Sequence, residues 1–258
     1  GTGFVLFGNF ILTNVHLFKG CMEGNKLKEH IKVHALFNYE EPEPNTNFLH
    51  FIVKSLIDSD DELDYAVLEL KPEEQKANDQ SVPAGLLKKF GPKPENGEAC
   101  IIGHPAGGVK RIDPTCIIEP EKREQAIRDH LAFYKDTMII VQIINQIKDR
   151  GIDDIRVGGN KEHVSTYNTY MYHGASGSPV FDAHGQLFGL HTAGFGYGYP
   201  KMINSVIEFA QPLLTIFEKF VCNLKESGNT QMLDRVKEAV ADNDKLTEIL
   251  KVEPMEVE

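Results

Sequence analysis

The stretch YHGASGSPVFDAHG, residues 172–185, contains two serines that stand two positions apart among small residues. A serine hydroxyl becomes a nucleophile only when a base accepts its proton and a third group orients that base. A glycine-serine turn between two strands is the simpler interpretation of such a composition. Ser176 and Ser178 are therefore assessed together with the histidines and carboxylates in the rest of the chain.

A histidine and an aspartate occur where predicted strands end and begin. His16 follows the apolar run FILTNV, and Asp64 immediately precedes the apolar run YAVLEL. A carboxylate at the start of a strand can be half buried and directed at one partner, whereas Asp58, Asp60 and Asp61 belong to a more polar loop. Each residue alone has a simple structural explanation: His16 could cap a strand end, Asp64 could cap a turn, and Ser176 could be an ordinary loop residue.

The order along the chain is histidine, aspartate, serine, which is the chymotrypsin order. The α/β-hydrolases would require the serine first, followed by the acid and then the histidine. They would also require a G-x-S-x-G motif, and the fifth position here is Ser178. The α/β-hydrolase alternative therefore fails on both order and motif.

The composition excludes some classes of function. Lys and Arg number 27 against 38 Asp and Glu, so the net charge of −11 argues against binding of nucleic acid through the overall field of the chain. No apolar run approaches the roughly 20 residues that span a bilayer. The four cysteines lack a CxxC pair, which favours an intracellular, reduced protein. Cys100 and His104 have no second ligand pair after them, so neither a metal nor another cofactor is expected.

Strands are the main elements expected to position these residues. Alternation of apolar residues, with β-branched and aromatic types enriched, predicts five strands in the first seventy residues. These strands are TGFVLF, NFILTNV, IKVHALF, FLHFIVKSLI and YAVLEL. After a connection rich in Pro, Gly and Lys over residues 83–97, further strands are expected at EACIIGH, at RIDPTCII, and around 164–172, 178–182, 186–192 and 202–206.

Helices are expected in two places. Residues 121–149 contain few turn residues, and isoleucines recur there every four positions, which predicts a helical insertion. The segments SVIEFAQPLLTIFEKFVCNL and QMLDRVKEAVADNDKLTEILK near the end are also expected to be helical. Many short strands in two blocks followed by helices indicate paired barrels or sandwiches.

Four motifs, TGFVLFGNFILTNVH, DYAVLEL, GASGSP and LFGLHTAG, together resemble the trypsin-like serine proteases of the chymotrypsin fold. GASGSP is similar to the G-D-S-G-G-P motif of that family, which makes Ser176 the expected nucleophile. The resemblance implies that His16 is the general base and that Asp64 orients it. It also implies an oxyanion hole made by the backbone N–H groups of Gly174 and Ser176.

The resemblance implies a mainly β fold of two six-stranded antiparallel β-barrels. Residues 1–85 would form the N-terminal barrel with His16 and Asp64, and residues 86–206 the C-terminal barrel with Ser176 and the helical insertion. Residues 207–258 would add C-terminal helices and an acidic tail, and all three parts would form one protease domain. Because the chain opens at Gly1 inside a predicted strand, that start is interpreted as a processing or fragment boundary.

The sequence departs from the family pattern at two positions. Ala175 stands where secreted members carry the Asp that pairs with a freed N-terminal amine, so activation must come about in another way. The extra helical segments 121–149 and 229–250 motivate the hypothesis of activation by self-association, as a homodimer. Tyr170 stands where proteases of basic specificity keep an Asp, and Thr192, Ala193 and Gly194 match the strand that lines the substrate pocket. Cleavage after large apolar or aromatic residues is therefore expected.

GASGSPVFD, the GHPAGG loop and the helical insertion are most similar to the vertebrate proteases called family with sequence similarity 111. That resemblance implies an intracellular, nuclear protease linked to DNA replication, DNA damage and autocleavage. It implies protein substrates, and nucleic-acid contacts outside these residues. Two alternatives stay open: a catalytically dormant protease-fold binding or scaffold module, and a bacterial-type housekeeping protease, although no binding domain follows residue 220 as the latter would require.

Overall fold

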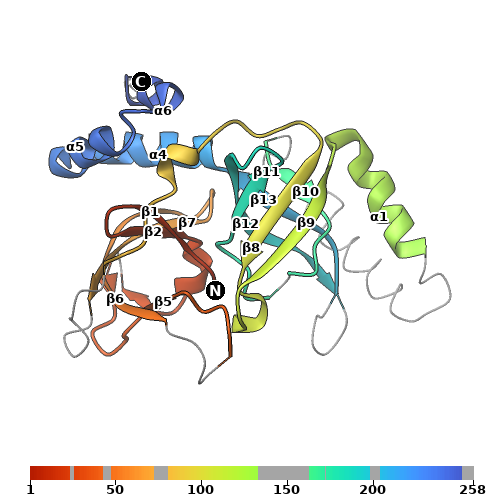
Figure 1. Cartoon of the computed structure of the whole chain (residues 1–258), viewed down its shortest axis with the longest axis horizontal. Helices are drawn as coiled ribbons and strands as arrows, with labels where there is room; N and C mark the ends of the chain where they lie inside the picture. Colours follow the sequence, from red (N-terminus) through yellow and green to blue (C-terminus); the bar gives the residue numbers. More distant parts are fainter. Residues whose placement is uncertain are drawn as a thin grey trace.

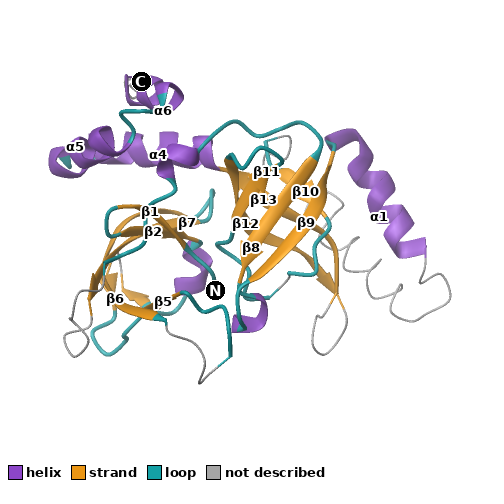
Figure 2. Ribbon diagram, in the orientation of Figure 1, coloured by secondary structure: helices purple, strands orange, loops and turns teal. Residues whose placement is uncertain are grey.

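The computed structural model describes residues 1–23, 26–42, 48–72, 81–132, 163–171, 173–197 and 204–251. Two β units lie side by side, and a layer of helices extends across one end of them (Figures 1 and 2). The first β unit ends at Pro72, and the second runs from Glu98 to Pro212. None of the helices in the described ranges is long and apolar enough to cross a membrane.

The first β unit is an antiparallel sheet in the order β1-β2-β7-β6-β5. Its strands are β1 (Phe4–Phe7), β2 (Phe10–Thr13), β5 (His34–Phe37), β6 (Leu49–Asp60) and β7 (Tyr65–Pro72), and a separate hairpin pairs β3 (Met22–Glu23) with β4 (Lys26–Leu27). The sequence predicts a closed six-stranded barrel in this half. Among the described residues the sheet has five strands and stays open, because β1 pairs only with β2 and β5 only with β6.

The second β unit is a closed six-stranded barrel, as predicted. The strand order is β10-β13-β12-β11-β8-β9, and every neighbouring pair is antiparallel. The strands are β8 (Glu98–Gly103), β9 (Arg111–Ile118), β10 (Ser165–Tyr167), β11 (Pro179–Asp182), β12 (Leu187–Tyr197) and β13 (Asn204–Pro212). The barrel interior holds its own apolar cluster, which includes Ile101, Val180 and Phe188.

Helix α1 (Arg123–Ala132) follows β9 and extends away from the barrel (Figure 1). It covers the start of the helical insertion expected at 121–149, and residues 133–149 lie outside the described residues. The guanidinium of Arg123 fixes the helix to the barrel: its Nε donates to Thr166 Oγ1 at 2.9 Å, and another nitrogen donates to the Val164 carbonyl at 2.7 Å.

The C-terminal helices are α4 (Leu213–Glu226), α5 (Thr230–Ala239) and α6 (Asp244–Lys251). The predicted helix over SVIEFAQPLL is wrong in its first part, because residues 204–212 form strand β13 and the barrel extends to Pro212. Proline has no backbone N–H and biases the residue before it toward extended conformations, so α4 begins only after Pro212. The second predicted helix is divided between α5 and α6.

Helix α4 joins the two β units through the largest apolar cluster of the molecule. Its buried face packs with Leu12 and Val67 of the first sheet and with Leu187 and Leu190 of the barrel. The buried residues that α4 contributes are Leu213, Ile216, Phe217, Phe220, Val221 and Leu224. Because this cluster contains residues from both β units, it stabilises their contact as well as the helix.

We expect Phe217→Ala to lower the free energy of unfolding by about 3–5 kcal/mol, because it leaves a cavity at a buried ring in the apolar cluster that contains residues of both β units. Denaturant unfolding followed by circular dichroism measures the change. Glu218→Ala, one position away on the exposed side of α4, is the control and should change that free energy by less than about 0.5 kcal/mol. Equal effects of the two substitutions would contradict the role of this cluster.

Candidate active site

His16 and Asp64 contact each other through two separate bonds. His16 lies in a short 3-10 turn, Val15–Phe18, that follows β2, and Asp64 immediately precedes β7. One carboxylate oxygen of Asp64, Oδ2, lies 2.6 Å from His16 Nδ1. The other, Oδ1, accepts the backbone N–H of His16 at 3.0 Å. The carboxylate therefore fixes both the backbone and the ring of the histidine, and leaves Nε2 as the ring nitrogen able to act on a substrate or a serine.

The backbone of Asp64 adopts an uncommon conformation that aims its side chain. Its φ of +51° lies in the left-handed region, where Asp is tolerated better than most residues. Asn14 supports this turn, because its amide donates to the Asp64 carbonyl at 2.7 Å. The same amide lies 3.3 Å from Thr192 Oγ1 in the second β unit. Asn14 is completely buried, and it links the carboxylate-bearing turn to strand β12.

The structure distinguishes the two serines of the GASGSP turn. Ser178 is completely buried, and its hydroxyl donates to the Ala175 carbonyl at 2.5 Å within the turn. Ser176 is half-buried, so solvent and a substrate can reach it. Gly177 has a φ of +90°, and a Cβ there would lie 2.0 Å from the Thr2 carbonyl oxygen, so only glycine fits beside Ser176. Ser178 is therefore a structural residue of the turn, and Ser176 is the more exposed of the two serines.

Two backbone carbonyls of the serine turn accept hydrogen bonds, one from the loop that follows β8 and one from Thr2. The His173 carbonyl accepts the N–H of Ala106 at 2.5 Å, and the Gly174 carbonyl accepts the Thr2 hydroxyl at 2.9 Å. In a trans peptide the N–H points away from the C=O, so the N–H of Gly174 faces away from Ala106. Among the described residues the N–H groups of Gly174 and Ser176 have no hydrogen-bond partner.

Hydrogen bonds also link the histidine side of the site to the serine side. Thr13, at the end of β2, donates its hydroxyl to the Thr2 carbonyl at 2.6 Å. Thr2 in turn donates its backbone N–H to the Ser176 carbonyl at 2.8 Å. His16 lies three residues after Thr13, so this chain of bonds attaches the serine turn close to the strand end that leads to the histidine. Within the described residues, no hydrogen bond joins Ser176 Oγ to His16.

The residues expected to line a substrate pocket lie in two places. Thr192, Ala193 and Gly194 are consecutive in β12, where Thr192 is buried and the other two are exposed. Tyr170 lies on the loop after β10 and is 51% exposed, with its hydroxyl donating to the Ile112 carbonyl at 3.2 Å.

A buried polar cluster lies inside the barrel, and the sequence patterns did not single it out. The Tyr167 hydroxyl lies 2.8 Å from His191 Nδ1, and His191 Nε2 lies 3.8 Å from a carboxylate oxygen of Glu208. Burial lowers the pKa of His191 to about 4 and raises the pKa of Glu208 to about 7. A Cβ on Gly194 would lie 2.1 Å from the Glu208 carboxyl carbon, so this carboxyl lies directly behind the expected pocket strand.

A family model described as the trypsin-like peptidase domain matches residues 1–190. The chain is 34% identical over 226 residues to Serine protease FAM111A of Mus musculus, which covers 83% of this chain and 35% of the relative. It is 29% identical over 272 residues to Serine protease FAM111B of Homo sapiens, which covers 99% of this chain and 35% of the relative. The chain thus spans about a third of the length of these two relatives.

Among solved structures, the apo form of the MamO protease domain from Magnetospirillum magneticum resembles the chain over 83% of its length and 84% of the length of that domain. The sequence identity is 12% and the TM-score is 0.49, so this likeness carries no argument about the site.

The pKa of Glu208 predicts a dependence of stability on pH. Its folded-state value of about 7 lies above the ordinary value of 4.5, so the neutral carboxyl stabilises the folded chain at low pH. That stability is lost as pH rises from about 4.5 through 7. Relative to wild type, Glu208→Gln should therefore gain about 2 kcal/mol of unfolding free energy between pH 5 and 8, measured by denaturant titration at each pH. Exposed Glu218→Gln is the control, and a constant difference between Glu208→Gln and wild type would contradict the buried carboxyl.

Proposed function

This chain belongs to the trypsin-like peptidase family, and we propose that it is a serine endopeptidase whose catalytic triad is His16, Asp64 and Ser176. The double contact from Asp64 to His16 carries this proposal, because it fixes a histidine in the tautomer and orientation that a general base requires. Two further observations support the same assignment: Ser176 is only partly buried, and the N–H groups of Gly174 and Ser176 have no partner within the described ranges.

In the proposed reaction, His16 Nε2 accepts the proton of Ser176 Oγ as that oxygen attacks the scissile carbonyl carbon. The N–H groups of Gly174 and Ser176 would stabilise the oxyanion that forms, and one such donor is typically worth about 3 kcal/mol of barrier. The imidazolium, stabilised by Asp64, then protonates the leaving amine and leaves an acyl-enzyme. Water activated by His16 hydrolyses the acyl-enzyme and restores the serine.

The second candidate is a catalytically dormant protease-fold binding module. It draws on one observation: no hydrogen bond between Ser176 and His16 forms among the described residues. Catalytic hydrogen bonds are often loose without substrate and tighten in the complex, so we rank this candidate below the peptidase.

We expect a fluorescent fluorophosphonate to label the chain, Ser176→Ala to abolish labelling, and Ser178→Ala to retain it. Ser178→Ala removes only a buried hydrogen bond and should cost about 1 kcal/mol of stability. In-gel fluorescence at several protein concentrations measures the rates. Labelling that survives in Ser176→Ala would refute the nucleophile, and absence of labelling in wild type at every concentration would favour the dormant module.

Those concentrations also test the proposed homodimer, because activation by association predicts that the labelling rate per molecule rises with protein concentration. The proposal rests on Ala175, which is buried in the barrel core and cannot pair with an N-terminal amine. Met232 and Val236 of α5 and Leu246 of α6 are already buried in the same apolar cluster as the buried face of α4, so a dimer would use other surfaces. A strictly monomeric chain with full activity would exclude this mode of activation.

We propose that cleavage follows large apolar or aromatic residues, with Thr192, Ala193, Gly194 and Tyr170 as the pocket residues. None of these four carries a negative charge that would pair with a basic side chain. Digestion of a peptide library, read by mass spectrometry, should therefore show Phe and Tyr before the cleaved bond. Preferred cleavage after Arg or Lys would contradict this specificity and would draw attention to the carboxyl of Glu208 behind Gly194.

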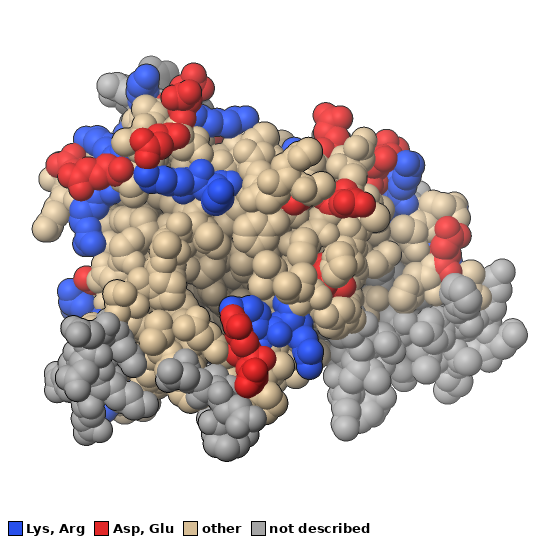
Figure 3. Space-filling model, viewed as in Figure 1, with Lys and Arg blue, Asp and Glu red and all other residues tan. Residues whose placement is uncertain are grey.

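From the resemblance to the family with sequence similarity 111, we propose a nuclear protease that acts on DNA-associated proteins and cleaves itself, within a longer protein that holds the nucleic-acid contacts. Figure 3 shows that, on one face, Lys and Arg side chains are interspersed with Asp and Glu over the helical layer, while much of the surface over the strands is uncharged. Together with the net charge of −11, this distribution supports placing DNA contacts elsewhere.

A further inference from the structure

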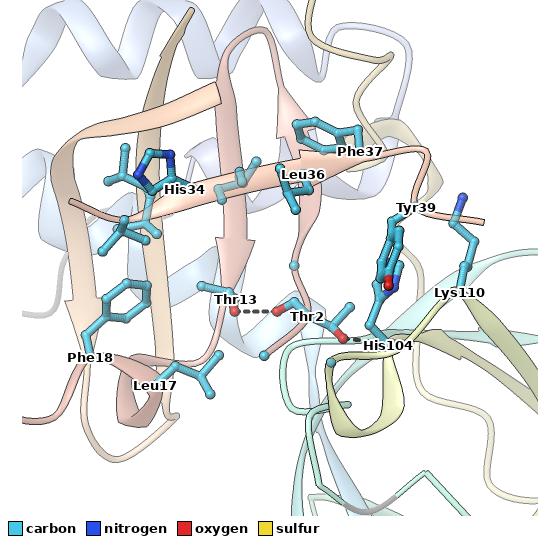
Figure 4. Close-up of a pocket in the computed structure, with 18 of the residues that line it drawn as sticks. Thr2, Thr13, Leu17, Phe18, His34, Leu36, Phe37, Tyr39, His104 and Lys110 are labelled. Atoms are coloured by element: carbon cyan, nitrogen blue, oxygen red, sulfur yellow. Dashed lines mark hydrogen bonds between the residues drawn. The ribbon is translucent and has the colours of Figure 1, made fainter. Parts of the chain in front are cut away.

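Thr2 lies just before β1 and is only 6% exposed, yet its polar atoms contact three separate segments. Its hydroxyl donates to the Gly174 carbonyl at 2.9 Å and accepts the N–H of His104 at 3.0 Å. Its backbone N–H donates to the Ser176 carbonyl at 2.8 Å, and its own carbonyl accepts the Thr13 hydroxyl at 2.6 Å. Figure 4 shows the last of these bonds together with that from His104.

The turn that Thr2 contacts requires an outside restraint. Gly174 has a φ of +85°, and a Cβ there would lie 2.7 Å from the Ala106 nitrogen, so no other residue fits. Glycine leaves the two adjoining peptide planes free to rotate. The plane before Gly174 is tied by the bond from Ala106 to the His173 carbonyl, and the plane after it is tied by the Thr2 hydroxyl.

Thr2, Thr13 and His104 also line a pocket of about 530 Å³, and the close-up in Figure 4 shows how these three residues lie beside it. The Thr2 side chain itself is buried. A substitution that keeps its size therefore preserves most of its packing and removes the two hydrogen bonds of its hydroxyl.

We propose that Thr2 is a positioning residue for the oxyanion-binding turn, a role in which its hydroxyl sets the peptide plane after Gly174 and its backbone N–H anchors Ser176. The proposal rests on the proposed peptidase function. It also identifies side-chain bonds to a turn in which residue 175 is a buried Ala and offers no polar side chain of its own. Because the restraint is an uncharged hydroxyl, it does not depend on a titrating amine or carboxylate.

The test compares Thr2→Val, Thr2→Ser and Thr2→Cys in this chain, using a fluorophosphonate whose phosphonyl oxygen occupies the oxyanion hole. Labelling rates at varied probe concentration give a maximal rate constant and a half-saturating concentration, and thermal unfolding gives the folded fraction. Thr166→Val is the matched control. Its buried hydroxyl also donates to a carbonyl and accepts from a side-chain nitrogen, at 2.8 and 2.9 Å, but it lies at the contact of α1 with the barrel.

We expect Thr2→Val to lower the maximal rate constant per folded molecule at least about tenfold, a fraction of the 10²–10³ that loss of a whole oxyanion donor costs. The half-saturating concentration should change less than twofold. Thr2→Ser should remain within about threefold of wild type, whereas Thr2→Cys, a weak donor of similar size, should fall with Thr2→Val. Thr166→Val should lose thermal stability and keep its rate constant.

A Thr2→Val rate constant within twofold of wild type, or equal loss in Thr2→Val and Thr166→Val, would overturn the role of Thr2 while leaving the peptidase proposal intact. If Thr2→Val does not fold, the Ser and Cys variants decide, since equal rates for these two would overturn the role. A wild-type chain labelled no faster than Ser176→Ala would instead overturn the peptidase function itself, and the role of Thr2 with it.

Discussion

The two β units each carry only part of the proposed site, so the contact between them is the constraint on which the rest of the structure depends. The histidine and its carboxylate belong to the first unit, and the serine turn belongs to the second. The buried amide of Asn14 contacts Thr192 across this boundary, and Thr2 contacts Ser176 across it. These polar bonds fix how the two units are oriented, whereas the apolar cluster around α4 buries side chains from both units together.

Hydrogen bonds and apolar contacts contribute to this boundary in different ways. Hydrogen bonds require a defined distance and angle between donor and acceptor, but each adds only about 1 kcal/mol to net stability. Apolar burial contributes more free energy and does not depend on direction. A site that needs atoms from two units at defined distances therefore uses both hydrogen bonds and apolar burial. The apolar cluster around α4 holds the units together, and a few buried polar side chains determine how they meet.

Much of the barrel could be predicted from the sequence, because alternation of apolar residues is a local pattern. The prediction failed at residues 205–212, where SVIEFAQP fits either a strand or a helix and the tertiary pairing with β12 decides for the strand. Asp64 and His16 could be paired in advance because each adjoins an apolar strand. The roles of Asn14 and Thr2 could not, since their partners lie 178 and 172 residues away, and no local pattern contains that information.

The buried polar cluster behind the pocket strand illustrates a different limit. His191 stands in the apolar run LFGLHTAG, and Glu208 stands in a strand that the sequence assigned to a helix. The sequence did contain one signal of this cluster, since His191 is a polar residue within an apolar run. Its role could not be predicted from that signal, because closure of the barrel decides which other polar groups lie beside the His191 ring, here Tyr167 and Glu208.

The long sequence separation of these contacts has a consequence for the timing of activity during synthesis. A ribosome delivers the chain from its N-terminus, so Thr2, His16 and Asp64 emerge long before Ser176. The boundary between the β units is complete only when α4, residues Leu213–Glu226, is also available to cover it. A nascent chain would thus carry every proposed catalytic side chain before it could hold them together, and the proposed site would be assembled only after α4 has emerged.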